Sequence, residues 1–133
     1  MTGASDHDKV LEKLLLLEWQ RAGTPAKDLE VWPIPRPTGG IGLCVNFLPM
    51  ENDQSEAMVR IVITNLIETG IAKRYSALQF AVSRPLADPN RNIVVSRYFL
   101  EDDRLRALES DPESIRNASL DTLVTTKIEL PFP

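Results

Sequence analysis

The chain has 133 residues, enough for one domain that buries a core without help from a metal ion or a disulfide. Its 15 basic and 19 acidic residues give a net charge of −4, which argues against nucleic-acid binding because phosphate backbones repel a negative surface. A single cysteine, no basic leader and no apolar run near the ~20 residues of a membrane span predict a cytoplasmic protein without a membrane partner.

The first predicted helix covers residues 6–22 and carries more apolar side chains than one core-facing stripe needs. Ser5 predicts its N-cap, and Gly23 predicts its end because glycine readily adopts the left-handed conformation there. At 100° per residue, Val10, Leu14 and Leu17 form one stripe that is expected to face the core, and Leu11, Leu15 and Ala22 widen it. Leu16 and Trp19 fall on the far side, so we expect this helix to be covered on more than one side.

Residues 28–38 are predicted to be extended. Three prolines in this segment lack the N–H that a sheet ladder needs, which indicates an edge strand or a polyproline-like arm. Two glycines at positions 39 and 40 predict a turn, and the alternation over residues 41–48 predicts a strand.

Helical spacing of apolar residues between positions 58 and 67 predicts a second long helix. Asp53 and Glu56 have the spacing of a capping box, and Gly70 follows the expected end. Two strands, residues 75–83 and 92–100, then form a predicted hairpin with a long loop.

The last part of the chain predicts a short helix over residues 102–110, one more helical turn after Asp111, and a final strand over residues 121–130. Together the elements predict an α+β fold. We expect an antiparallel sheet of about five strands with helices packed on one face, in a single domain covering residues 1–133.

No group of residues is spaced for catalysis, a metal ion or a cofactor, and we expect none of the three. Cys44 lies between apolar strand neighbours and has no histidine near it in sequence, so we expect a buried, inert thiol. His7 is the only histidine and is expected to be a solvated surface residue. Two acidic clusters, residues 51–56 and 101–103, fall at predicted helix starts, where negative charge complements the helix dipole.

Arg97 is the charge that the pattern explains least well. Strand parity places it on the same face as three apolar residues, Ile93, Val95 and Phe99. Arg84 and Arg91 lie at the base of the same hairpin, and the three arginines together could hold an anion. The alternative is an edge arginine that reaches solvent, or a one-residue bulge that shifts the register.

Two tryptophans complete the set of candidate binding residues, because tryptophan dominates many interfaces. Trp19 lies beside Leu16 on the far side of the first helix and is expected at an interface, whereas Trp32 fits either an interface or a core. These residues favour a non-catalytic protein-binding module, an adaptor or chaperone-like accessory protein that forms a homodimer or larger assembly. In size and acidic charge alone, without a shared motif, the chain is similar to small dimeric secretion chaperones. The alternative hypothesis is a small enzyme or ligand-binding protein that holds an anionic small molecule through its hairpin arginines.

Overall fold

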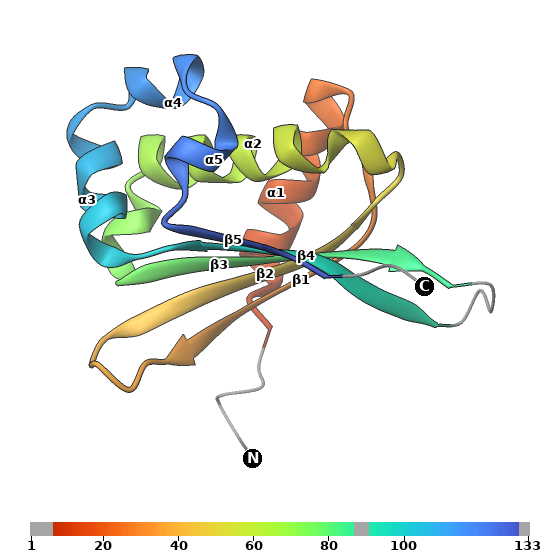
Figure 1. Cartoon of the computed structure of the whole chain (residues 1–133), viewed down its shortest axis with the longest axis horizontal. Coiled ribbons are helices and arrows are strands. Elements are labelled where there is room, and N and C mark those ends of the chain that lie inside the picture. Colours follow the sequence, from red (N-terminus) through yellow and green to blue (C-terminus); the bar gives the residue numbers. More distant parts are fainter. Residues whose placement is uncertain (1–6, 87–90, 131–133) are drawn as a thin grey trace.

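The structure, a computed structural model, describes residues 7–86 and 91–130 (Figure 1). Within that part of the chain, five α-helices and five strands alternate in the order α1, β1, β2, α2, β3, β4, α3, α4, α5, β5. The helices are α1 (Lys9–Ala22), α2 (Ser55–Glu68), α3 (Asp102–Ser110), α4 (Glu113–Asn117) and α5 (Leu120–Leu123). The strands are β1 (Ala26–Pro35), β2 (Ile41–Pro49), β3 (Ala77–Pro85), β4 (Asn92–Leu100) and β5 (Thr126–Glu129). Short 3-10 turns at Asn52–Gln54 and Ile71–Arg74 flank α2.

The five strands form one sheet whose order follows the chain, β1-β2-β3-β4-β5. Three of its four strand pairs are antiparallel, but β2 and β3 are parallel. The α+β class is therefore confirmed, whereas the expectation of a purely antiparallel sheet is wrong at this pair. The reason is α2, which carries the chain from the end of β2 back to the start of β3, so that both strands run in the same direction.

One apolar core joins the sheet to the helices, which lie above it in Figure 1. The strand residues in this core alternate along each strand and therefore share one face of the sheet. They are Leu29, Val31, Leu43, Val45, Phe47, Leu78, Phe80, Val82, Tyr98 and Leu100. Their helical partners are Leu11, Leu15, Trp19, Met58, Val59, Val62, Ile63, Leu66, Leu105, Leu108, Ile115, Leu120 and Leu123.

The helix ends are set by local chemistry. The carboxylate of Asp8 caps α1, while the predicted cap, Ser5, lies outside the described residues. Gly23 ends α1 with a φ of 78°, a left-handed conformation that favours glycine, so the predicted end is confirmed. At the start of α2, Gln54 is the N-cap, so the capping box predicted at positions 53 and 56 does not form.

α1 is rotated relative to the sequence-based prediction. Its core-facing residues are Leu11, Leu15 and Trp19, spaced by four, whereas Val10 and Leu17 at the centre of the expected stripe face outward and Leu14 is only partly buried. Trp19 is completely buried, and its indole Nε1–H donates a hydrogen bond of 3.0 Å to the Met58 carbonyl of α2. Tryptophan has the largest apolar side chain of the helix, so burying it gains more than burying Val10.

The edge strand β1 is closed against further strand pairing. The Val31 amide donates to the Glu12 carboxylate of α1 at 2.7 Å, and the Val31 carbonyl accepts from the Asp8 amide at 2.7 Å. The backbone N–H and C=O groups of every second residue in β1 point away from β2. After Val31, the next two residues of this kind are Pro33 and Pro35, which have no N–H. The predicted edge strand is confirmed, and its prolines lie where an exposed donor would otherwise invite aggregation.

The C-terminal segment differs from the prediction of one long strand over residues 121–130. Residues 120–123 form the short helix α5, and only Thr126–Glu129 belong to β5. Leu120 and Leu123 are both buried in the core, and a spacing of three places them on one side of a helical turn. In a strand they would point to opposite faces of the sheet.

Candidate partner-binding surfaces

The outward stripe of α1, defined here as Val10, Leu14 and Leu17, is the most exposed apolar feature of the helix. Val10 is 81% exposed and Leu17 is 51% exposed, while Leu14 is partly buried against the core. The spacing of four and then three is the spacing by which one helix packs along another. Leu16 is 39% exposed and lies on a different side of α1, about 100° from Leu17.

The three residues predicted to bind a partner therefore have three different surroundings. Leu16 is exposed, as expected. Trp19 is not on the surface at all, and the expectation that it forms an interface is corrected, because the core of the same chain encloses its ring. Trp32 is partly buried on the sheet face opposite the core, where it stacks on His7 with ring centroids 5.5 Å apart.

His7 is packed rather than freely solvated, contrary to expectation. Its two ring nitrogens lie 3.5 Å from the carboxylates of Glu12 and Glu30, one on each side. Together with the stacking on Trp32, these contacts hold the start of α1 against β1. No local pattern predicts this packing, because the partners of His7 come from both α1 and β1.

The hairpin arginines do not form one site. Arg84 lines a hollow on the core side of the sheet together with Val82 and Tyr98. Arg97 has the opposite parity to Tyr98 and pairs with Ala81, which places it on the other face. Arg91 is exposed at the hairpin base.

A β-bulge explains part of the difference from the predicted parity. The register between β3 and β4 shifts after Val82, which pairs with Ser96, while Ser83 pairs with Val94. Val95 is the extra residue, and it lines the core-side hollow instead of sharing a face with Arg97. The hypothesis that Arg84, Arg91 and Arg97 converge on one anion is therefore without geometric support.

The hollow that contains Arg84 has a volume of about 470 Å³ and a second cation, Lys127. The Lys127 ammonium lies 3.3 Å from Asp121, 3.3 Å from Glu129 and 3.9 Å from Glu56. Burial disfavours the charged form of Lys127, but the neighbouring carboxylates outweigh this effect and raise its pKa. The positive charge of Lys127 is thus already paired with carboxylates of the same chain and is not available to an anion.

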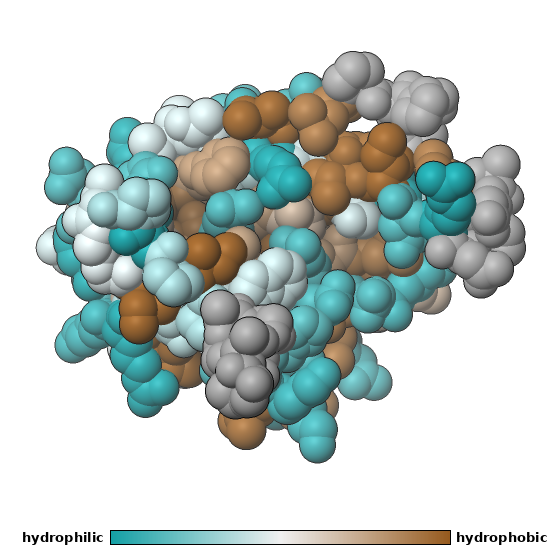
Figure 2. Space-filling model, turned by 90° about the horizontal axis from the view of Figure 1, so that it is seen from below, coloured by the Kyte–Doolittle hydropathy of each residue, from teal (hydrophilic) through white to brown (hydrophobic). Residues whose placement is uncertain are grey.

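The sheet face opposite the core, called the lower face below, is shown in Figure 2, where brown apolar side chains gather in patches between teal polar ones. The register places on it Asp28, Glu30, Trp32, Ile34, Cys44, Asn46, Leu48, Ala77, Gln79, Ala81, Arg97, Phe99 and Ile128. Away from the acidic residues Asp28 and Glu30 on β1, this face carries more apolar side chains than a solvated sheet face usually does.

Cys44 lies on this lower face but is buried, with Trp32 and Gln79 as its neighbours on the adjacent strands. Burial raises the pKa of its thiol to about 11, although the nearby Arg97 charge acts in the opposite direction. A thiol in this state is a poor nucleophile, as the sequence predicted.

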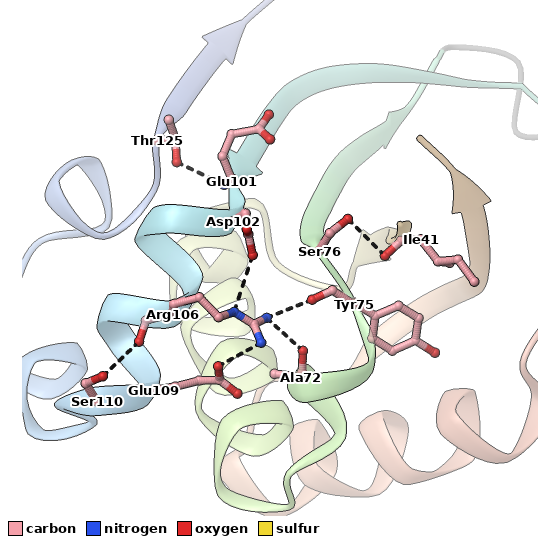
Figure 3. Close-up of polar contacts among 10 residues, drawn as sticks. All are labelled: Ile41, Ala72, Tyr75, Ser76, Glu101, Asp102, Arg106, Glu109, Ser110 and Thr125. Carbon is pink, nitrogen blue, oxygen red and sulfur yellow. Dashed lines mark hydrogen bonds and ion pairs between the residues drawn. The ribbon is translucent and has the colours of Figure 1, made fainter. Parts of the chain in front are cut away.

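The acidic cluster at residues 101–103 has a structural role (Figure 3). Arg106 of α3 donates to the carbonyls of Ala72 and Tyr75 at 3.0 and 2.7 Å and pairs with Asp102 and Glu109 at 3.5 and 3.0 Å. These contacts attach α3 to the turn that follows α2. α3 begins at Asp102, so the predicted position of the cluster at a helix start is confirmed.

Within residues 7–86 and 91–130, no group of three metal-ligating side chains lies together, and no helix is long and apolar enough to cross a membrane. Comparisons of the chain with protein-family models, with curated proteins and with solved structures find no match. The function must therefore be argued from the surfaces of this chain.

Proposed function

We propose that this chain is a non-catalytic protein-binding module, of the adaptor or chaperone-like kind, that self-associates through the outward stripe of α1. One observation carries the proposal. The inner stripe of α1 already supplies the core with Leu11, Leu15 and Trp19, yet its outer side presents Val10 and Leu17 to the surface.

A second copy of the chain is the occupant that fits this stripe best. A two-fold axis across the middle of α1 would place the stripe of one copy against that of the other, so that a single apolar surface covers itself. Each aliphatic side chain that becomes fully buried contributes roughly 1.5 to 3 kcal/mol relative to its exposed state. The stripe is short compared with the ~800 Å² per partner of a stable interface, so we expect association at micromolar concentrations rather than an obligate dimer.

Strand pairing is a poor alternative route to self-association at β1. Pro33 and Pro35 remove two outward donors, and α1 occupies the backbone groups of Val31. The anion-binding alternative loses its basis as well, because Arg84 and Arg97 lie on opposite faces of the sheet.

Light scattering on three proteins tests which surface is used. The Leu17→Lys variant places a charge in the stripe and should lower the molar mass toward that of one chain, 14.9 kDa. Ile41→Lys is the matched control, because Ile41 is 48% exposed, close to the 51% of Leu17, but lies on β2 beside the hairpin turn. An equal effect of both substitutions, or no effect of Leu17→Lys on an associated wild type, would remove α1 as the self-association surface.

A further inference from the structure

Arg97 is a cation of the lower face whose neighbours on the adjacent strands carry no charge. It is half-buried, and it makes no side-chain hydrogen bond or ion pair with any other residue in the part of the chain that the structure describes. Its neighbours on the adjacent strands are Ala81 and Ile128, and Cys44 lies close enough for its pKa to respond to the arginine charge. A partly desolvated cation among apolar neighbours is stabilised when a carboxylate reaches it.

A second unsatisfied polar group lies in the same row across the sheet. Asn46 pairs with Ala81, which in turn pairs with Arg97, so Asn46 and Arg97 are two strands, roughly 10 Å, apart. The Oδ1 atom of Asn46 is buried and accepts no hydrogen bond from the described residues. The row ends at Glu30, whose carboxylate lies 3.5 Å from His7, one strand further from Arg97.

An apolar hollow of about 220 Å³ lies beside this row. Ile34, Cys44 and Phe99 contribute to its lining. Its rim includes the ion pair of Arg36 and Glu101, at 2.6 Å, so that Glu101 is already taken by another arginine. The surface therefore offers apolar contacts next to a cation that lacks an acid.

The chemistry of a sheet face indicates which kind of segment fits. The backbone groups of β2, β3 and β4 are used within the sheet, so this face presents side chains only. An occupant must therefore satisfy its own backbone hydrogen bonds, which an α-helix does and an extended peptide does not.

We propose that the lower face binds an amphipathic helix of a partner protein, which places a carboxylate on Arg97 and apolar side chains on Trp32 and Phe99. This inference rests on the protein-binding half of the proposed function and is independent of self-association through α1. The negative charge required of the helix is set by Arg97, the one cation of the lower-face set given above.

A displayed library of helix-forming peptides tests the proposal with the intact chain as bait. Wild-type protein should enrich peptides with an apolar stripe interrupted by Asp or Glu, and Arg97→Glu should change that position to Lys or Arg. Arg104→Glu is the control, because Arg104 is an exposed arginine on α3, outside the lower-face set, and should give the wild-type preference. Absence of any enriched peptide, or the same acidic preference with Arg97→Glu, overturns the proposal.

Fluorescence anisotropy then measures the best peptide and its Glu→Gln form. The Glu→Gln peptide should bind wild type at least tenfold more weakly than the original peptide, because the charge pair is lost. The two peptides should bind the Arg97→Gln variant with similar affinity. The melting temperature of Arg97→Gln shows whether this variant is folded. Equal affinities of both peptides for wild type contradict the assignment. A fall in molar mass caused by Arg97→Gln also overturns it, because a second copy would then occupy this face.

The Leu17→Lys variant separates the two proposals. If it is monomeric and still binds the peptide, the lower face acts as inferred. If peptide binding disappears together with self-association, the two surfaces are not independent, and the proposal that the lower face binds the helix by itself is wrong.

Discussion

Two side chains of α1, Trp19 and Glu12, make polar contacts that determine which apolar side chains the helix buries. The Trp19 indole donates to the Met58 carbonyl, and the Glu12 carboxylate accepts from the Val31 amide. Both groups would be costly to bury without a partner. They point to the same side of the helix, so Leu11 and Leu15 are turned inward and Val10 and Leu17 outward.

Trp19→Phe should therefore reduce the free energy of unfolding by about 2 to 3 kcal/mol. The substitution removes one hydrogen bond and leaves a gap beside Phe47, whose ring centroid is 5.0 Å away. Trp32→Phe is the control, with an expected loss below about 1 kcal/mol, because that ring is only partly buried. Urea denaturation compares the two variants, and a larger loss for Trp32→Phe would mean that the core is centred elsewhere.

Cys44 should react slowly with thiol reagents at neutral pH, because its side chain is buried and its pKa is raised to about 11. The neutral thiol stabilises the fold below about pH 9, the usual thiol pKa given for this group, and this contribution is lost as the pH rises toward 11. The Cys44→Ala variant should cost about 1 to 2 kcal/mol at neutral pH and lose less stability than wild type between pH 9 and 11. Labelling at neutral pH as fast as a free small thiol contradicts this assignment.

Among the contacts between elements, the contact between α1 and β1 both closes the edge strand and sets which side of α1 faces the core. Asp8, Glu12 and His7 all contribute to this contact: Glu12 accepts from the Val31 amide, the Asp8 amide donates to the Val31 carbonyl, and His7 stacks on Trp32. α1 therefore has two roles, because its inner side closes an edge strand while its outer side remains exposed.

Glu12→Ala should reduce the free energy of unfolding by about 2 to 3 kcal/mol, the range for a buried donor that loses a charged acceptor. Glu12→Gln should cost less, because its amide oxygen can still accept from Val31. Hydrogen exchange provides the specific readout, with faster exchange expected at the Val31 amide in the alanine variant. Unchanged exchange at Val31 in Glu12→Ala shows that the contact between α1 and β1 does not depend on this carboxylate.

Periodicity and turn chemistry predicted most of the elements but not their mutual arrangement. Gly23 ends α1, α3 covers residues 102–110 as expected, and β3 and β4 form the predicted hairpin. These features depend on neighbours in the chain. The rotation of α1 does not depend on chain neighbours, because eight of its residues are apolar or aromatic and the sequence therefore offers two plausible inner stripes.

The surroundings of the candidate site residues are predicted less well, because they also depend on contacts between distant parts of the chain. The helical spacing places Trp19 opposite the expected stripe and so predicts it at the surface, and the hydrogen-bond partner that holds it in the core, Met58, is 39 residues away in the chain. Arg97 stands out in the sequence, but its separation from Arg84 depends on the strand register and on a bulge, which the sequence offers only as one alternative.

At the scale of the whole molecule, several of the basic side chains are used internally. Arg36, Arg106 and Lys127 each pair with carboxylates of the same chain. The negative net charge is therefore not offset by an assembled basic groove at these positions, and the absence of nucleic-acid binding stays a prediction. What remains for function are apolar surfaces on α1 and on the lower face.

Sedimentation equilibrium of the unmodified chain over a range from 1 to about 100 µM tests self-association most directly. We expect the mass to rise with concentration from 14.9 kDa toward twice that value, and to be little affected by salt because the stripe of α1 is apolar. A single species of 14.9 kDa at every concentration would contradict the account.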